Sequence, residues 1–223
     1  MKIIAKFISI IFHPLIITTY VLILLMAFNP YIFGAQQEKE RVILVLLVFF
    51  STFLIPGIAV ALMKFIGLVD SFDMPDAKQR IMPYIACGIF YLWMFINIVH
   101  NPDIPFIFSA FVLGATVALF IAFIINIFSK ISLHAVGAGG LVGIVVLILA
   151  SNYSSGMLID FPLFGTYELN VAAILMIVLI LAGLIGSARL ILKAHELKDI
   201  FSGFFLGFCT QFLAFIILFQ WLN

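Results

Sequence analysis

The chain has 223 residues, of which 65% are hydrophobic and only 9% are charged, and its mean hydropathy is +1.33. A soluble domain averages about 45–50% apolar and about 25% charged residues, so this composition excludes an ordinary soluble domain and indicates a membrane protein with several spans. The net charge of +1 excludes the basic footprint that nucleic-acid binding requires, and the two cysteines, Cys87 and Cys209, lie in apolar runs that indicate neither a disulfide framework nor a metal site.

Long apolar segments divide the chain into predicted membrane spans. A spanning helix needs roughly 20 mostly apolar residues, and segments that meet this criterion lie at residues 7–28, 42–67, 82–99, 105–128, 135–151, 170–190 and 200–222. No segment alternates apolar and polar residues as the strands of a membrane barrel do. We therefore predict an all-α polytopic membrane bundle of about seven spans that forms a single domain over residues 1–223, with the first span retained rather than cleaved as a signal peptide.

The polar loops between these spans fall into two groups, because alternate loops lie on opposite faces of the membrane. One face, called the near face below, carries the loops at residues 69–81, 129–134 and 187–199. The far face carries the loops at residues 29–41, 100–104 and 151–169. Of the 11 Lys and Arg residues, all except Lys39 and Arg41 belong to the near face, so the positive-inside rule predicts that this face is cytoplasmic.

The sequence SARLILKAHELKD, residues 187–199, interrupts the apolar chain with a cluster of charged residues. His195 and Asp199 are four residues apart, so on a helix their side chains lie on one face. An aspartate that accepts a hydrogen bond from one imidazole nitrogen leaves the other nitrogen as a nucleophile or base. Arg189 can act on the same target only if the helix breaks before His195, as the return of the chain across the membrane requires. The alternative interpretation is a solvated helix end.

Two further polar clusters belong to the near face. Ser132 and His134 precede a helix start that is rich in small residues, where backbone N–H groups and a hydroxyl favour an anion. The alternative there is an N-cap serine beside an interfacial histidine. Lys78 and Arg80 precede the third span and could clamp a phosphate, although either residue alone is also typical of anchoring at the membrane edge.

Small residues recur at four-residue spacing in two of the predicted spans, as Gly139 with Gly143 and Gly203 with Gly207. Such pairs let membrane helices approach closely. Gly203 continues the helical face of His195, so we expect helix packing there to hold the histidine and aspartate in place.

The motifs of these clusters resemble those of the type 2 phosphatidic acid phosphatase family. Arg189, His195 and Asp199 have the spacing of the family's third motif, SRxxxxxHxxxD. The sequence SLH at residues 132–134 resembles its second motif, PSGH, with Leu133 in place of the glycine.

The family's first motif, KxxxxxxRP, has a looser counterpart in KQRIMP at residues 78–83. Lys78 stands in for the family's lysine, at whose position this chain has Asp73.

The family consists of metal-independent membrane phosphatases, so the resemblance implies a lipid phosphate or lipid diphosphate substrate, membrane lipids as partners, no cofactor, and a multi-pass protein of a bacterial inner membrane. Most bacterial members act at the outer face of that membrane, which is opposite to the orientation that the charge count predicts.

The resemblance also implies a role for each matched residue. His195 would be the nucleophile that forms a phosphohistidine, and Asp199 would orient its ring. His134 would protonate the leaving alkoxide and later activate water. The phosphoryl oxygens would be held by Arg189, Lys78, Arg80 and Ser132.

Two other functions are compatible with the residues. Asp70, Asp73 and Asp76 have a spacing that could bind a metal–diphosphate, as in a magnesium-dependent intramembrane prenyl- or phosphotransferase. The other alternative is a transporter or a catalytically inactive lipid-binding relative, in which ionisable residues within the spans would mark a pathway. His13 is the main residue of that kind in this chain.

Overall fold

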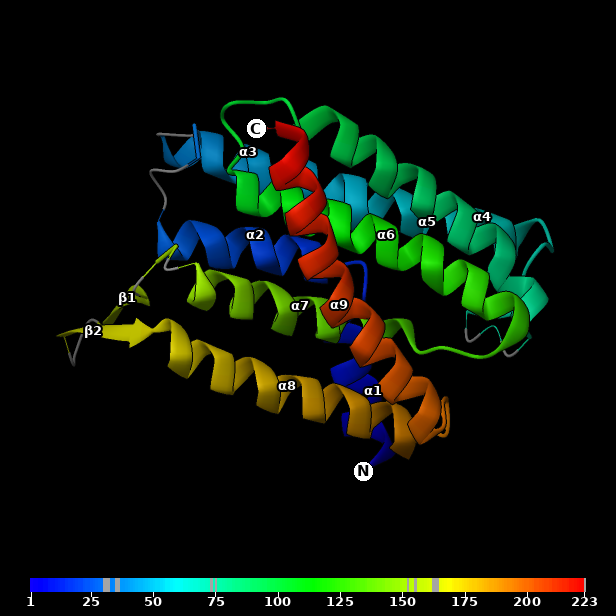
Figure 1. The fold of residues 1–223 in the computed structure, drawn as a ribbon. Coiled ribbons are helices and arrows are strands. Elements are labelled where there is room, and N and C mark those ends of the chain that lie inside the picture. The colour runs from blue at the N-terminus through cyan, green and yellow to red at the C-terminus, as the bar shows by residue number, and fades with distance from the viewer. Residues whose placement is uncertain are drawn as a thin grey trace.

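The structure is a computed structural model that describes residues 1–29, 33–34, 37–72, 74, 76–151, 153–154, 156–161 and 165–222. Its elements in chain order are α1 (Lys2–Ile11), α2 (Ile17–Phe28), α3 (Glu38–Phe49), a π-helical turn (Phe50–Leu54), α4 (Ile55–Phe65), α5 (Ala77–Ile98), α6 (Phe106–Phe128), α7 (Leu133–Ala150), β1 (Gly156–Phe161), β2 (Gly165–Asn170), α8 (Val171–Ile191) and α9 (Leu197–Leu222). Figure 1 shows a bundle of helices, with strands in one hairpin only among the described residues. The predicted all-α membrane bundle is confirmed.

The first predicted span, residues 7–28, is two helices instead of one. α1 ends at Ile11 and α2 begins at Ile17. Pro14 explains the break, because it lacks a backbone N–H and disfavours a helical conformation at His13. With 12 residues, α2 is about 18 Å long and shorter than the ~30 Å hydrocarbon core. Within the described residues, 6 helical segments rather than seven are long and apolar enough to cross a membrane.

The contact between α7 and α9 is the most extensive contact between two helices, and it depends on glycine. A Cβ on Gly203 would lie 2.7 Å from the carbonyl oxygen of Ser132. A Cβ on Gly207 would overlap the carbonyl oxygen of Val136, and one on Gly139 would overlap that of Phe204. The prediction that these small residues bring helices together is confirmed, because the two backbones touch where side chains are missing.

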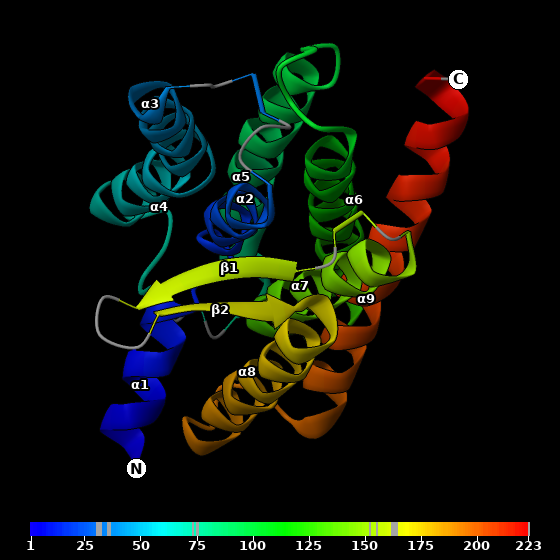
Figure 2. The ribbon, with the colours of Figure 1, turned by 90° about the vertical axis from the view of Figure 1, so that its left-hand side faces the viewer.

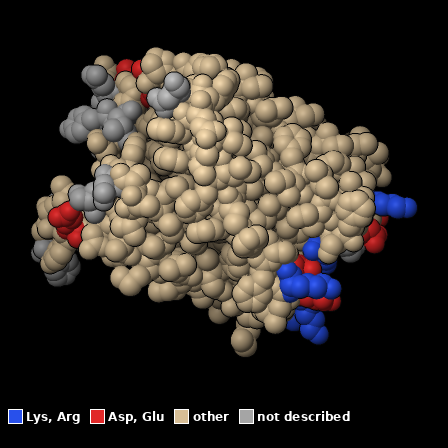
Figure 3. All heavy atoms as spheres, viewed as in Figure 1, with Lys and Arg blue, Asp and Glu red and all other residues tan. Residues whose placement is uncertain are grey.

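Polar loops gather at two ends of the bundle. The turns that follow α4, α6 and α8 lie together at the right-hand end in Figure 1, as predicted for the near face. The opposite end carries the β1–β2 hairpin, which pairs Gly156 with Asn170 in antiparallel register and takes up much of a segment predicted as a loop. Figure 2 shows this hairpin lying across the end of the bundle. In Figure 3, Lys and Arg side chains gather at the near end, and the middle of the visible surface is free of charged side chains.

Candidate active site

The chain turns sharply between α8 and α9, and the predicted break between Arg189 and His195 is confirmed. Arg189 lies in the last turn of α8, which ends at Ile191, and α9 begins at Leu197. Lys193 has a φ of 54°, a left-handed conformation that few residues other than glycine adopt. This turn reverses the chain and places His195 just before the first turn of α9.

His195 and Asp199 are in contact, as their spacing predicted. Nδ1 of His195 lies 3.3 Å from Oδ2 of Asp199, and the same oxygen accepts a hydrogen bond from the backbone N–H of Glu196 at 3.2 Å. Asp199 is buried, with 2% of its surface exposed. An ionised carboxylate only accepts hydrogen bonds, so Nδ1 of His195 carries the hydrogen and Nε2 keeps its lone pair.

Ser132 joins the second polar cluster to this pair. Its backbone N–H donates to the carbonyl oxygen of Asp199 at 3.1 Å. Its side chain accepts from the N–H of Ala135 at 3.5 Å and so caps the N-terminus of α7. Ser132 is fully buried, and its geometry matches the N-cap interpretation of this residue. The cap and the backbone bond fix the start of α7 against the start of α9.

His134, in the first turn of α7, points toward α1. Its Nε2 lies 3.0 Å from the carbonyl oxygen of Ser9, and its ring packs edge-on against His13, with ring centroids 5.6 Å apart. Arg189 reaches the same residue of α1, because its Nη1 donates to Oγ of Ser9 at 3.4 Å. Sequence reasoning missed Ser9, since no residue pattern indicates a backbone carbonyl that binds a distant histidine.

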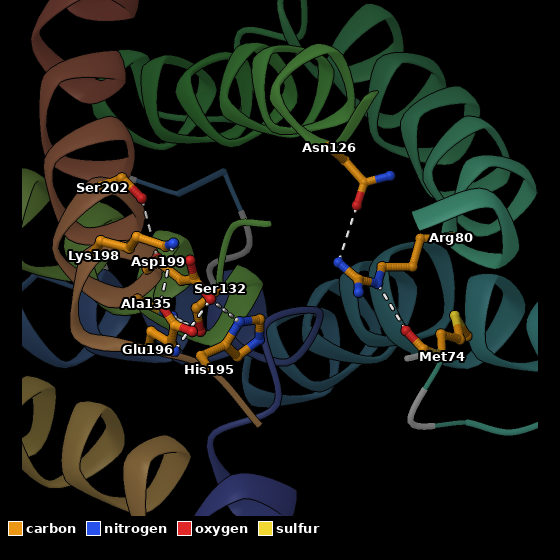
Figure 4. Close-up of polar contacts among 10 residues, drawn as sticks. All are labelled: Met74, Arg80, Asn126, Ser132, Ala135, His195, Glu196, Lys198, Asp199 and Ser202. Carbon is orange, nitrogen blue, oxygen red and sulfur yellow. Dashed lines mark hydrogen bonds and ion pairs between the residues drawn. The ribbon is translucent and has the colours of Figure 1, made fainter. Parts of the chain in front are cut away.

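Arg80 lies on α5, apart from the group around His195 in Figure 4. Its Nη1 donates to Oδ1 of Asn126 at 3.0 Å, and its Nε donates to the carbonyl oxygen of Met74 at 2.8 Å. Asn126 also donates to the carbonyl oxygen of Ala77 at 3.0 Å, and it is 1% exposed. Lys78 is exposed to solvent. Sequence reasoning overlooked Asn126, although a lone asparagine in an apolar span signals a buried polar contact.

Two cavities adjoin at the near face. One, of about 380 Å³, is lined by residues that include His195, Asp199 and Lys193. The other, of about 230 Å³, is lined by residues that include Arg80 and Asn126. Residues 129–130 line both cavities. The loop at residues 129–130 therefore lies between the two cavities, and Arg80 and His195 face different ones. The other predicted site residues line neither of these two cavities, namely Lys78, Ser132, His134 and Arg189.

The surroundings of His195 keep its ring neutral. Burial lowers the pKa of His195 to about 4, and the positive charge of Arg189 acts in the same direction. The hydrogen bond to Asp199 opposes these effects only in part. At neutral pH the imidazole therefore has one free lone pair, on Nε2, which a nucleophile requires.

The acidic segment DSFDMPD shows a hydrogen-bonding role for two of its three aspartates. Nε2 of Gln79 donates to Oδ2 of Asp70 at 2.6 Å and lies 3.5 Å from Oδ2 of Asp76. Asp73 lies outside the described residues. Within the part of the chain that the structure describes, no group of three or more His, Cys, Asp or Glu side chains is placed to hold a metal ion.

A comparison with protein families finds a match in the carboxyl-terminal part of the chain. Residues 120–222 match the PAP2 superfamily, whereas no curated protein and no solved structure matches. The matched region begins within α6 and contains all of α7, α8 and α9. It therefore includes both histidines and the turn that carries Arg189, and it leaves α1 to α5 outside. Over residues 120–222, this polytopic membrane bundle is therefore similar to the PAP2 superfamily, and the match supports a phosphatase-type activity.

Proposed function

We propose that the protein hydrolyses a lipid phosphate or lipid diphosphate at the membrane surface, through a phosphohistidine and without a metal. The contact between His195 and Asp199 carries this proposal, because it leaves a neutral nitrogen nucleophile beside a cavity at the end of an apolar bundle. Lys130, Lys193 and Lys198 line the same cavity and attract an anionic headgroup. The lipid tail stays in the bilayer along the apolar helices.

The reaction has two steps, and the two histidines have different roles in them. In the first, Nε2 of His195 attacks phosphorus, the bond to the leaving lipid alkoxide breaks, and His134, which enters the step protonated on both ring nitrogens, gives that alkoxide one of its two ring protons. In the second, His134 takes a proton from water, the water oxygen attacks phosphorus, and the phosphorus–nitrogen bond breaks. Inorganic phosphate leaves, and His195 is neutral again.

Cationic and polar groups take the place that metal ions have in other phosphoryl-transfer enzymes, where charge stabilisation and positioning provide most of the catalysis. Arg189 binds the phosphoryl oxygens beside His195, and Ser132 supports the site from the start of α7. Arg80 binds phosphate oxygens from the adjoining cavity, which it lines and which meets the first at Lys130. Lys78 binds phosphate oxygens from the same first turn of α5. On the positive-inside rule, this near face is the cytoplasmic face of a bacterial inner membrane.

Hydrolysis should continue in the presence of EDTA, because side chains supply all of the charge on which the proposal relies. The measurement is phosphate release from a panel of lipid phosphates and diphosphates by purified protein, with and without chelator. Asp70→Asn and Asp76→Asn are matched variants that should keep activity within about twofold. Loss of turnover in EDTA that magnesium restores, together with loss in these variants, would support the metal-dependent transferase alternative instead.

The activity should persist as the pH falls from neutral to about pH 5, and then decline with an apparent pKa near 4. The nucleophile must be neutral. Because the pKa of His195 is lowered to about 4, its ring becomes protonated, and activity is lost, only as the pH approaches that value. The measurement is the rate of phosphohistidine formation in single turnovers, corrected for ionisation of the substrate.

A variant pair makes this pH dependence specific to His195. The charge of Lys130 also lowers the pKa of His195, so Lys130→Gln should move the decline to higher pH. Lys64→Gln removes a lysine that instead lies over the ring of Phe72, 4.1 Å from its centroid, and should leave the profile unchanged. A wild-type decline centred near 6.5, the ordinary pKa of a histidine, would contradict this interpretation.

A further inference from the structure

Ser9 makes two contacts with the candidate active site from a helix that lies outside the matched region. Its carbonyl oxygen lies 3.0 Å from Nε2 of His134, and its hydroxyl oxygen accepts from Nη1 of Arg189 at 3.4 Å. Ser9 itself is 7% exposed. One residue of α1 therefore contacts both the proposed acid and the proposed phosphate-binding arginine, and it does so through two different atoms.

The contact with His134 determines which of its nitrogens can exchange a proton with the substrate. A backbone carbonyl oxygen can only accept a hydrogen bond, so Nε2 of His134 must carry the hydrogen that the oxygen of Ser9 receives. Nδ1 is then the nitrogen that gains and loses the proton during the reaction. The carbonyl of Ser9 thus orients His134 as the carboxylate of Asp199 orients His195, although it carries no charge and stabilises a protonated ring less.

The contact with Arg189 uses the hydroxyl group. Arg189 is in the last turn of α8, just before the chain turns toward His195. A guanidinium group binds phosphate best when its planar fork is held in one orientation, and a hydrogen bond from one nitrogen to Ser9 holds it from the side of α1.

α1 is held in a position that lets Ser9 make both contacts. It packs against α8, and its buried side chains are Ala5 and Ser9. Its other side exposes Ile3, Phe7 and Ile10, which is typical of an amphipathic helix that lies against lipid. Packing against α8 therefore holds the side of the helix that carries Ser9.

We propose that Ser9 is a positioning residue of the phosphatase site, and that α1 completes this site by orienting His134 through a carbonyl and Arg189 through a hydroxyl. The inference rests on the proposed function for its kinetic consequence. Its structural part, the orientation of His134, holds or fails independently of any activity.

The tautomer of His134 tests the structural part. Nitrogen-15 NMR of the full-length protein with labelled histidine, assigned with a His134→Gln variant and recorded at a pH high enough for a neutral ring, should show Nε2 of His134 protonated and Nδ1 unprotonated. His100, on the far face, serves as the internal comparison. A His134 ring protonated on Nδ1, or one that averages rapidly between tautomers, would overturn the proposed role of the Ser9 carbonyl.

Kinetics of Ser9→Ala test the role of the hydroxyl. A charge-assisted hydrogen bond is worth about 1.4 kcal/mol or more, so kcat/KM for a lipid phosphate should fall about tenfold, mainly through a higher KM. Ser51→Ala is the matched control, because Ser51 has the same 7% exposure but lies in the π-helical turn. It should leave kcat/KM unchanged within about twofold.

A double-mutant cycle separates an effect through Arg189 from a general loss of structure. If Ser9 acts by orienting Arg189, adding Ser9→Ala to an Arg189→Lys variant should cost less than about twofold. An equal loss in both backgrounds, or no loss from Ser9→Ala in the wild type, would overturn this role. A wild-type protein that hydrolyses no lipid phosphate would instead contradict the proposed function, while the NMR result would still decide the contact of Ser9 with His134.

Discussion

His195→Ala should abolish turnover of every lipid phosphate and prevent formation of a phosphoenzyme. The variant removes the only atom that the proposal allows to attack phosphorus, and loss of the nucleophile in a covalent hydrolase lowers kcat on the order of 10⁶-fold. The measurement combines phosphate release with trapping of labelled enzyme from a lipid substrate that carries ³²P. Because phosphohistidine is stable in base and labile in acid, the reaction should be quenched at high pH.

Two further variants show whether the loss is specific to the nucleophile. His100→Ala removes a histidine of the turn between α5 and α6, whose ring lies 5.3 Å from that of Trp221 in the last turn of α9, and should keep full activity. Asp199→Asn should keep the fold and reduce turnover less than loss of the nucleophile does, because the ring stays but its tautomer is no longer enforced. Activity of His195→Ala at the wild-type level would contradict the phosphatase mechanism.

Gly207→Ala should be among the most destabilising small substitutions in the chain. Its Cβ would overlap the carbonyl oxygen of Val136, which is backbone and cannot rotate away. Overpacking of a close helix contact costs about 1–3 kcal/mol, and separation of α7 from α9 would also lengthen the hydrogen bond from Ser132 to Asp199. We therefore expect both stability and activity to fall.

Gly183→Ala is the matched control for this substitution. Gly183 is also a helical glycine, in α8, but a Cβ there would meet nothing within 4 Å. The exchange should be neutral or stabilise the helix by about 0.5–1 kcal/mol. The measurement is the midpoint of thermal unfolding in detergent, followed by circular dichroism. Equal midpoints for the two alanine variants would show that the contact between α7 and α9 does not depend on Gly207.

The fold class and much of the near face follow from local sequence properties. Span length and hydropathy are sums over neighbouring residues, so most of the predicted spans agree with the helices to within a few residues. The contact between His195 and Asp199 also follows from helical periodicity, since one turn separates them. The first span was predicted wrongly because the prediction rested on hydropathy and ignored Pro14. The effect of a proline on the backbone is a local property too, so the sequence contained the signal for this break.

The contacts that complete the candidate site were decided by tertiary structure alone. Ser9 and His134 are 125 positions apart, and Arg80 and Asn126 are 46 apart. Such pairs form only where packing brings helices together, and periodicity within one helix says nothing of its neighbours. Sequence by itself determined a membrane bundle with its charged loops at one end and a histidine paired with an aspartate. Only the tertiary structure placed Ser9 of α1 beside His134 at that end. Every residue has a backbone carbonyl, so no residue type in the sequence marks the one that binds the histidine.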